Sequence, residues 1–403
     1  MRRVPDKLKS IFQDSVWSIT GLVLMNVAAQ FVVFPCWNRV LGSEAYGNIV
    51  YLLGIMNILA ISVGSGVNYA RMRKSSEGET ANRPYNILMA AGSGLSLVVL
   101  LVLKASGLLQ IGPVDFILFC ILTIVTMWRF YADVEYRLHI NYKGYFLYYL
   151  IIGLGYLAGV FLFKFTGCWP LALLPGEIAG LLLVLWKGSV FKKDVAAGSS
   201  AFPPILQLAA LLVGINVLSS LIFNGDRILL NFAAGSAAVS VFYIASLFGK
   251  TMTLITTPLN GVLVGHLAKY EGSLTARQMN QIAAMTAAGA VLATVVCVVA
   301  SMLILPLLYP ADYEAVRGYL ILANTAQVIY FTGNVLTTSI LLRFTSARNQ
   351  MLVPLVYGTL FLLVCIPATL KFGIRGFCWG LLIVNMIRYF YCLLLGYRGA
   401  KRI

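Results

Sequence analysis

The stretch QIAAMTAAGAVLATVVCVVASMLILPLLYPA, at positions 281–311, decides the fold because it holds no Lys, Arg, Asp or Glu. An α-helix rises about 1.5 Å per residue, so roughly 20 apolar residues cross the hydrocarbon core of a bilayer. Similar uncharged stretches cover positions 16–38, 45–70, 84–103, 144–163, 203–225, 318–342, 349–370 and 376–387. The sequence therefore predicts an all-α, polytopic membrane protein.

The composition excludes a soluble globular protein. Of the 403 residues, 60% are hydrophobic and 11% are charged, whereas soluble domains carry about a quarter charged residues. A net charge of +16 would suggest nucleic acid as a partner of a soluble chain. Here the basic residues lie in short loops, so membrane orientation explains them and no nucleic-acid partner is expected.

The cysteines and histidines do not form a metal-binding pattern. The seven cysteines lie singly in apolar segments, no CxxC occurs, and His139 and His266 are far from any cysteine in sequence. We expect the cysteines to be small apolar residues in helix interfaces, with no metal site, cofactor or disulfide framework.

The apolar segments divide into twelve predicted transmembrane helices. They cover positions 16–37, 45–69, 85–103, 114–133, 144–163, 169–186, 204–230, 236–263, 281–308, 317–342, 351–370 and 376–396. The first is too long for a cleavable signal peptide, so we expect it to stay in the protein. Most of the 30 Lys and Arg residues then fall on one side, which predicts that both termini are cytoplasmic.

Similar turns indicate two related halves. GSEAYG at 42–47 follows the first helix and GSAAVS at 235–240 follows the seventh, while KFTG at 164–167 and KFG at 371–373 precede the sixth and twelfth. Six helices are an even number, so both halves have the same orientation, and the substrate path of such parallel repeats lies between them. The predicted organisation is a six-helix lobe at 1–190, a cytoplasmic linker at 191–202 and a second six-helix lobe at 203–403.

Three stretches resemble a known family. NRVLGSEAYG at 38–47, GVNYAR at 66–71, and DRILLNFAAG at 226–235 with VFYIAS at 241–246 resemble the bacterial polysaccharide flippases, which export lipid-linked oligosaccharides for O-antigen and capsule. This family is part of the multidrug/oligosaccharidyl-lipid/polysaccharide exporter superfamily. The resemblance covers the whole chain in length, number of spans and duplication.

The resemblance implies a fold and a function. The fold is the one shared with multidrug and toxin exporters (MATE) and lipid II flippases, in which two six-helix lobes surround a central cleft. The implied substrate is undecaprenyl diphosphate carrying a sugar repeat unit, moved by alternating access to the outer leaflet of the bacterial cytoplasmic (inner) membrane. The implied partners are membrane lipids, a polysaccharide polymerase and a chain-length regulator.

Lys250 is the strongest candidate for binding an anionic substrate, because an ionisable group at membrane depth is costly and usually functional. It lies about 22 Å below the turn at Gly235 and is the sole charge between Ile228 and Ala268. The similar turns begin at positions 42 and 235, and the same offset of 193 residues aligns Lys250 with Asn57. Asn57 is polar and central in the second helix. The alternative is a lysine that reaches toward the cytoplasmic surface.

Three further charges lie nearer the outer end. Asp226 and Arg227 are about 12–14 Å from the turn at Gly235, and their adjacent side chains diverge by about 100°. Either Arg227 faces the cleft while Asp226 neutralises a neighbour, or the reverse; a structural ion pair with another helix is the alternative. Arg39 could hold diphosphate at the outer mouth or anchor the helix at the interface.

Arg388 in the last helix aligns with Glu177 in the sixth. Glu177 follows Pro175-Gly176 and is a candidate for proton coupling or a structural partner for a cation. Uncharged polar groups in apolar helices are predicted to bond across interfaces or to meet sugar hydroxyls. They are Asn26, Gln30, Asn68, Asn216, Asn224, Gln327, Asn334 and Asn385.

Two local patterns precede the sixth helix. Arg129, Asp133 and Arg137 are spaced to stack alternating charges on one helix face. A group of aromatic residues is predicted to form an interfacial belt, namely Trp128, Phe130, Tyr131, Tyr136, Tyr142, Tyr145 and Phe146.

Other functions fit the sequence less well. A cation-coupled multidrug or small-molecule exporter of the same fold is the main alternative, but it would need cleft carboxylates, and the mid-helix charges are mostly basic. An enzyme is not expected, since no DxD motif or large outer loop occurs, and no phosphate-binding Gly-rich loop indicates ATP hydrolysis. A proton gradient, a sodium gradient and the membrane potential remain alternative driving forces.

Overall fold

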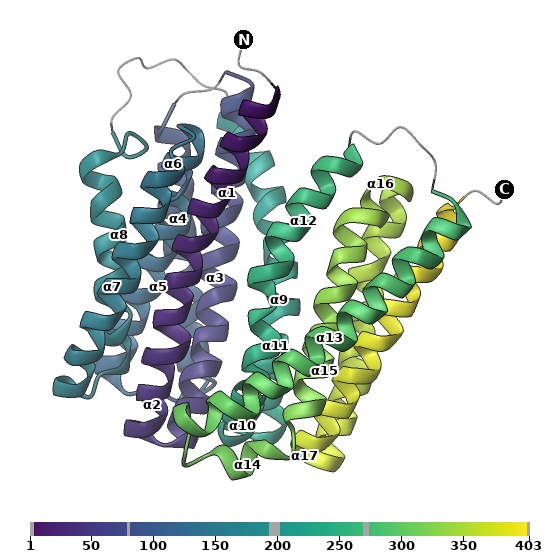
Figure 1. Cartoon of the computed structure of the whole chain (residues 1–403). Helices are drawn as coiled ribbons and strands as arrows, with labels where there is room; N and C mark the ends of the chain where they lie inside the picture. Colours follow the sequence, from purple (N-terminus) through teal and green to yellow (C-terminus); the bar gives the residue numbers. More distant parts are fainter. Residues whose placement is uncertain (1–3, 79–80, 193–201, 269–273, 401–403) are drawn as a thin grey trace. The chain divides into compact units, whose positions relative to one another are not determined.

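The chain folds into helices that form two compact units. The computed structural model describes residues 4–78, 81–192, 202–268 and 274–400, and every regular element in this part is a helix (Figure 1). The first unit comprises Met1–Val40 and Ile49–Ile228, and the second comprises Leu41–Asn48 and Leu229–Ile403. These units are defined by packing, whereas the lobes predicted at 1–190 and 203–403 rest on sequence repetition and stay a prediction.

The first unit contains most of the N-terminal helices. Its elements are α1 (Val4–Val27), the π-helix η1 (Ala28–Val33), α2 (Phe34–Leu41), α3 (Ser43–Ser76), α4 (Arg83–Ala105), α5 (Pro113–Ala132), α6 (Val134–Leu138), α7 (Tyr142–Thr166), the 3-10 helix η2 (Trp169–Ala172), α8 (Leu174–Lys187) and α9 (Phe202–Ala234). The beginning of α3 and the end of α9 belong to the second unit.

The second unit contains the remaining helices. They are α10 (Ser236–Ala245), α11 (Leu247–Thr251), α12 (Thr253–Ala268), α13 (Ala276–Leu308), α14 (Tyr313–Arg317), α15 (Leu320–Val335), the π-helix η3 (Leu336–Leu341), α16 (Leu342–Phe344) and α17 (Ala347–Gly399). The long α17 is two helices, because Gly373 interrupts it with φ 59° and ψ −144°. Such a backbone favours glycine, which has no Cβ to clash.

The chain is a multi-pass membrane protein, and its helices are roughly consistent with the twelve predicted spans. Within the described ranges, eight helices are long and apolar enough to cross a membrane, and the bent pair of α10 and α11 is a ninth candidate. The remaining three predicted spans correspond to the second helix within α17, the short α8, and α15 continued through η3 into α16. The predicted fold class is therefore confirmed.

Glycines allow the helices of the first unit to approach closely. A Cβ added to Gly155 of α7 would lie 2.3 Å from the Cα of Gly176 in α8, and one added to Gly159 would lie 2.3 Å from the carbonyl oxygen of Ala172. Small residues four positions apart permit such contacts between membrane helices. This packing brings α8 against α7, and α8 also contacts α5, which positions Glu177.

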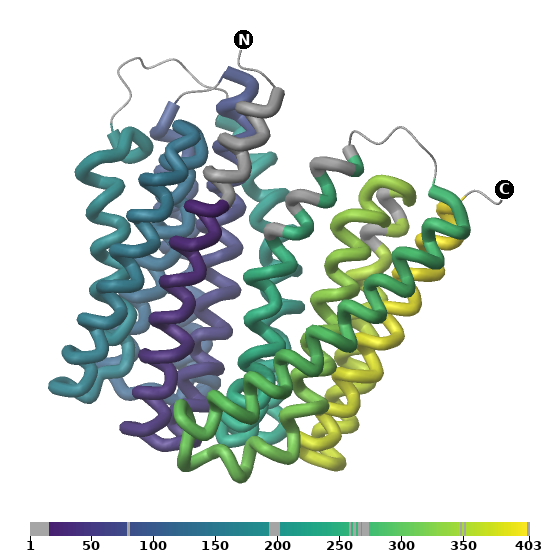
Figure 2. The backbone as a smooth tube through the Cα atoms, in the orientation of Figure 1, coloured from purple at the N-terminus to yellow at the C-terminus, as the bar shows by residue number. Residues whose placement is uncertain are grey.

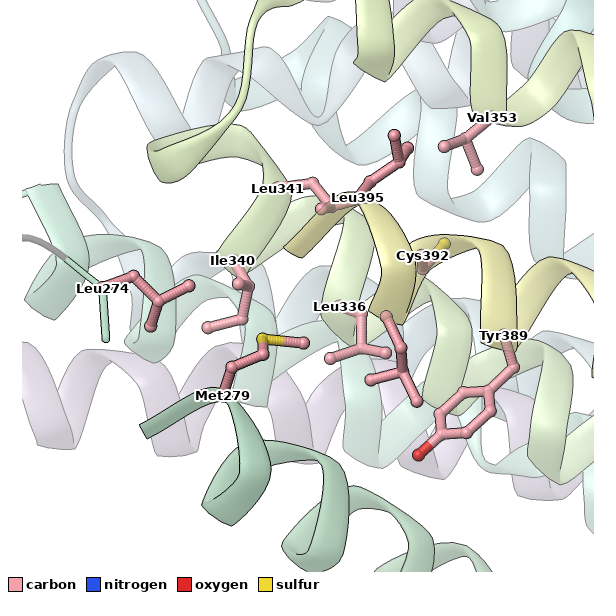
Figure 3. Packing of buried hydrophobic residues seen from close by; sticks show 10 residues of the cluster. Leu274, Met279, Leu336, Ile340, Leu341, Val353, Tyr389, Cys392 and Leu395 are labelled. Carbon is pink, nitrogen blue, oxygen red and sulfur yellow. The ribbon is translucent and has the colours of Figure 1, made fainter. Parts of the chain in front are cut away.

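The second unit is centred on α15. Figure 2 shows α13, α15 and α17 as neighbours, in agreement with their contacts. Figure 3 shows part of their apolar core, where Met279 of α13, Leu336 and Ile340 of η3, and Tyr389 and Cys392 of α17 are buried together. This core fixes α17 beside η3, which continues α15, and α17 also packs along α15 itself.

The predicted interfacial belt is wrong for several of its aromatic residues. Tyr131, Tyr136 and Tyr145 are buried, as are their neighbours Tyr148 and Tyr149. Tyr136 of α6 and Tyr145, Tyr148 and Tyr149 of α7 pack ring against ring, and Tyr131 of α5 packs against Trp128 and Phe191. Polar partners inside the unit bind hydroxyls of this group, so these tyrosines form a core rather than a surface facing lipid headgroups.

Candidate functional site

A break in the eighth predicted span positions Lys250. The segments Ser236–Ala245 and Leu247–Thr257 are bent by 63° relative to one another. Asn324 of α15 binds both sides of the break, because its Nδ2 donates to the carbonyl of Ala245 (2.9 Å) and its Oδ1 accepts from the amide of Gly249 (2.7 Å). One buried amide thus supplies partners for backbone groups that the broken helix leaves open.

Lys250 follows directly and is buried. The residue is 7% exposed, and its Nζ lies 5.4 Å from the ring centroid of Tyr243 and 5.9 Å from that of Phe242. Aromatic faces attract cations over such distances. Lys250 is therefore enclosed by protein, within the bent helix pair that is a candidate membrane span.

Arg388 is the second buried cation of this unit, at 8% exposure. Its Nη2 donates to Oδ1 of Asn334 (2.5 Å) and its Nη1 to the carbonyl of Tyr330 (3.3 Å), both on α15. The guanidinium carbon lies 4.7 Å from the ring centroid of Tyr330 and 5.2 Å from that of Tyr357. These partners of Arg388, all within the described residues, are neutral.

The membrane helices that follow position 229 contain no carboxylate. Between positions 229 and 403 the only Asp and Glu residues are Glu271, Asp312 and Glu314. Asp312 and Glu314 lie at the short α14, and Glu271 lies outside the described residues. The second unit also includes Glu44, which is exposed in the first turn of α3. Helices α10, α11, α13, α15 and α17 thus bury two cations without contributing an acid of their own.

The first unit stabilises the buried Arg129 differently. Nε of Arg129 in α5 lies 2.7 Å from Oε2 of Glu177 in α8, and the two side chains are 5% and 3% exposed. Tyr156 donates a hydrogen bond to Glu177, and Tyr148 donates one to the carbonyl of Arg129 at 2.9 Å. Of the two predicted roles for Glu177, this geometry matches the structural partner of a cation.

A second buried carboxylate, Asp133, joins three helices. Arg137 pairs with its Oδ2 at 3.0 Å, Asn68 of α3 donates to its Oδ1 at 2.5 Å, and Tyr149 donates at 3.1 Å. The predicted stack of Arg129, Asp133 and Arg137 is therefore only half formed. Helix α5 ends at Ala132, and Arg129 turns toward α8 instead.

Asp226 and Arg227 lie near the end of α9 in the first unit. Both are buried, and Oδ1 of Asp226 accepts a hydrogen bond from the backbone amide of Arg227 at 2.8 Å. Arg227 packs on α3, since a Cβ added to Gly54 would lie 3.4 Å from its Cδ. The half-buried Asn57 is three residues further along α3, so this helix carries a polar position one turn from the contact with Arg227.

Three other predicted site residues either bind within their own helix or lie at the surface. Asn224 and Asn26 donate to carbonyls of their own helices, at Ser220 (3.0 Å) and Leu22 (2.8 Å). Arg39 is exposed in the last turn of α2.

Within each unit the structure brings some of the predicted residues together. Arg388 and Asn385 of α17 both bind α15, Arg388 at Asn334 and Asn385 at the carbonyl of Ala326. Glu177, which the sequence repeat makes the counterpart of Arg388, is bound to Arg129 within the first unit.

Sequence reasoning missed Asn324, Arg129 as the partner of Glu177, and the tyrosine network. Tyr145, Tyr149 and Tyr156 are spaced four and seven residues apart, a pattern that places them along one helix face. That spacing could have identified a buried polar face on α7. Nothing in the sequence indicates that Asn324 binds the break after Ala245.

Solved membrane transporters share this fold. The Vibrio cholerae MATE transporter VcmN in its bent form matches with a TM-score of 0.60 and 15% identity, covering 97% of this chain and 96% of that one. An inward-facing multidrug resistance MATE transporter of the MOP superfamily matches at 0.67 and 14%, covering 94% and 97%. The lipid II flippase MurJ in its inward closed conformation matches at 0.61 and 14%, covering 95% and 87%.

The chain has the MATE and MurJ fold. No protein-family model matches the sequence, and no curated protein matches it. At such low identity the likeness establishes the fold alone, so the function of this MATE-like chain has to be argued from its own residues.

Proposed function

We propose that this protein is a flippase that moves undecaprenyl-diphosphate-linked oligosaccharide repeat units from the cytoplasmic to the outer leaflet. The product would serve O-antigen or capsule assembly. The observation that carries the proposal is the burial of Lys250 and Arg388 in a part of the chain whose membrane helices contain no Asp or Glu. Buried cations at membrane depth are expensive, and they are commonly retained because they act on a substrate.

The chemistry of a diphosphate matches these cations. A diphosphate leaves water only if fixed donors and positive charge replace its hydration, and hydrogen bonds between charged groups are the strong ones. Lys250 contributes an ammonium group directly after a helix break, and Arg227 contributes a guanidinium from the first unit. In the proposal Lys250 binds the diphosphate. The other predicted binding residues accompany the headgroup or the sugar: Arg227, Asp226, Arg39, Arg388, Asn57, Asn26 and Asn224.

A cation-coupled multidrug exporter is the second candidate, favoured by the likeness to MATE structures. Such an exporter would use a carboxylate to attract a cationic drug. Glu177 and Asp133 are already ion-paired with Arg129 and Arg137, and Asp226 is the third buried acid of the described residues. The proposal for an anionic substrate is preferred because it uses the two buried cations of the second unit.

The proposal includes a cellular setting. We place the protein in the bacterial cytoplasmic (inner) membrane with both termini cytoplasmic, as its basic loops predict. A polymerase and a chain-length regulator of the polysaccharide would act on the delivered repeat unit. Proton coupling through Glu177 requires its ion pair with Arg129 to open, because that pair and the hydrogen bond from Tyr156 occupy the carboxylate oxygens.

The direct genetic test replaces Lys250 in a strain whose surface polysaccharide depends on this protein. Lys250→Ala should lower surface polymer about tenfold or more, because it removes a charged hydrogen-bond donor to phosphate, and Lys250→Arg should retain part of the activity. Lys371→Ala is the matched control, since Lys371 is an exposed cation on α17. Normal polymer levels in Lys250→Ala cells with normal expression contradict the proposal.

A further inference from the structure

The second unit contains a pair of buried polar atoms that its own folding does not satisfy. Nε of Arg388 and Oδ1 of Asn385 are both buried, and neither makes a hydrogen bond within the described part of the chain. Arg388 is 8% and Asn385 is 1% exposed. Leaving one buried donor and one buried acceptor without partners is costly, so such groups need an explanation.

The two atoms come from one face of α17. Asn385 and Arg388 are three residues apart, which makes their side chains neighbours on a helix. The orientation of the Asn385 amide is fixed, because its Nδ2 donates to the carbonyl of Ala326 at 2.8 Å. Its Oδ1 must therefore be the acceptor that is left, and it lies close in sequence to the donor Nε–H of Arg388.

A glycine and two aromatic rings surround the guanidinium. Gly333 of α15 faces Arg388, and the only described atoms within 4 Å of a Cβ built there are Nη1 (3.7 Å) and Cζ (3.9 Å) of Arg388. Tyr330 and Tyr357 flank the same guanidinium. Asn334 uses its Oδ1 for Arg388, so its amide nitrogen is a further donor nearby.

We infer that this group is a subsite for a sugar hydroxyl of the transported glycan, an inference that rests on the proposed function. A hydroxyl accepts one hydrogen bond and donates another, so it can accept from Nε–H of Arg388 and donate to Oδ1 of Asn385. A phosphate cannot do both, because an ionised phosphate oxygen has no proton for the asparagine oxygen. Aromatic walls with a few oriented polar groups are typical of small-molecule sites.

The inference assigns different binding roles to two groups of residues in the second unit. Lys250 acts on the anionic headgroup, and Arg388 with Asn385 acts on the glycan. Both groups lie against α15, where Gly249 contacts Asn324 and Arg388 contacts Asn334. Residues 324 and 334 are separated by about 15 Å along a helix, and this span is compatible with a diphosphate joined to a sugar.

The test compares two probes on purified protein in nanodiscs. One probe is undecaprenyl diphosphate without sugar, and the other is the lipid-linked oligosaccharide extracted from the strain that carries this protein. Asn385→Leu and Gly333→Leu should weaken binding of the saccharide-bearing lipid about tenfold or more and should leave binding of the sugar-free lipid within about twofold. Gly333→Ala, whose Cβ fits without a clash, should fold normally and have the smaller effect.

Matched controls separate the possible outcomes. Gly289→Leu places the same side chain on an exposed position of α13, with no described atom within 4 Å of its Cβ, and should change neither affinity. Equal weakening of both probes by Asn385→Leu shows a headgroup site and overturns the inference. If Asn385→Leu changes the binding of neither probe, then Nε of Arg388 and Oδ1 of Asn385 do not bind the glycan, and the inference is also overturned. Failure of the wild-type protein to bind either probe contradicts the proposed function itself.

Discussion

Arg129 in the first unit and Arg388 in the second are both arginines buried in membrane helices, but they are stabilised in opposite ways. Arg129 is paired with Glu177 at 2.7 Å and enclosed by tyrosines that bind the same pair. Arg388 is held by an amide, a carbonyl and two aromatic rings. The ion pair of Arg129 and Glu177 has no net charge, and tyrosines bind both of its members. The surroundings of Arg388 leave its positive charge for an anionic or hydroxylated substrate.

The comparison teaches where to look for transport residues in such a chain. An arginine that has a buried carboxylate gains nothing from a passing anion, because the two would compete. The second unit, whose membrane helices contribute buried cations but no Asp or Glu, is the better candidate for substrate binding. The unit with the closed ion pair of Arg129 and Glu177 is the better candidate for a rigid support. The following substitutions test this division, beginning with the largest expected change in stability.

Breaking the ion pair of the first unit should have the largest effect. Arg129→Gln leaves the buried Glu177 without its cation, so we expect a loss of about 3–5 kcal/mol in the free energy of unfolding. Equilibrium unfolding of the purified protein in mixed micelles measures this loss. The double variant Arg129→Met with Glu177→Leu should be less destabilised than Arg129→Gln, and an equal or greater loss in the double variant argues against a purely structural pair.

Removing the amide at the helix break should have an intermediate effect. Asn324→Leu leaves the amide of Gly249 and the carbonyl of Ala245 without this partner, which should cost about 1–3 kcal/mol. Asn216→Leu is the control, because Asn216 donates to the carbonyl of Leu212 in its own helix. If both variants unfold at the same denaturant concentration, Asn324 does not hold the break that positions Lys250.

Neutralising Arg388 should change stability little and transport strongly. Arg388→Gln removes a buried charge that has neutral partners, so the unfolding free energy should change by less than about 1 kcal/mol, while surface polymer should fall several-fold. A parallel measurement of unfolding and of surface polysaccharide separates the two effects. If Arg388→Gln loses much stability but transports normally per folded molecule, Arg388 has a structural role like that of Arg129, which contradicts the prediction.

An exposed ion pair should have the smallest effect. Lys74 and Glu77 at the end of α3 lie 2.6 Å apart, and the hydrogen bond from Lys74 lowers the pKa of Glu77. Any stabilisation from this pair is present above the ordinary pKa of a glutamate and is lost as the pH falls through the lowered value. Because the pair is solvated, Glu77→Gln should leave the apparent melting temperature unchanged at pH 7. A measurable decrease would mean that burial does not explain the difference between this exposed pair and the buried pair of Arg129 and Glu177.

Much of the fold could be predicted from the sequence, because bilayer thickness fixes the length of an uncharged helix. Nine runs without Lys, Arg, Asp or Glu marked most of the twelve predicted spans, and the same reasoning singled out Lys250 and Arg388 as charges inside apolar helices. The pairing of Arg129 with Glu177 could not be predicted, because it depends on α5 packing against α8, and sequence spacing favoured Asp133 instead. Asn324 was missed for the same reason, since its partners lie 75 and 79 residues away in the chain.

The most direct measurement is flipping of the extracted lipid-linked oligosaccharide by purified protein in proteoliposomes, with Lys250→Gln compared against wild type and Lys371→Gln. The account predicts that Lys250→Gln lowers the flipping rate about tenfold or more, while Lys371→Gln flips at the wild-type rate. Equal rates for all three proteins, at equal reconstitution, contradict the claim that buried cations of the second unit carry the substrate.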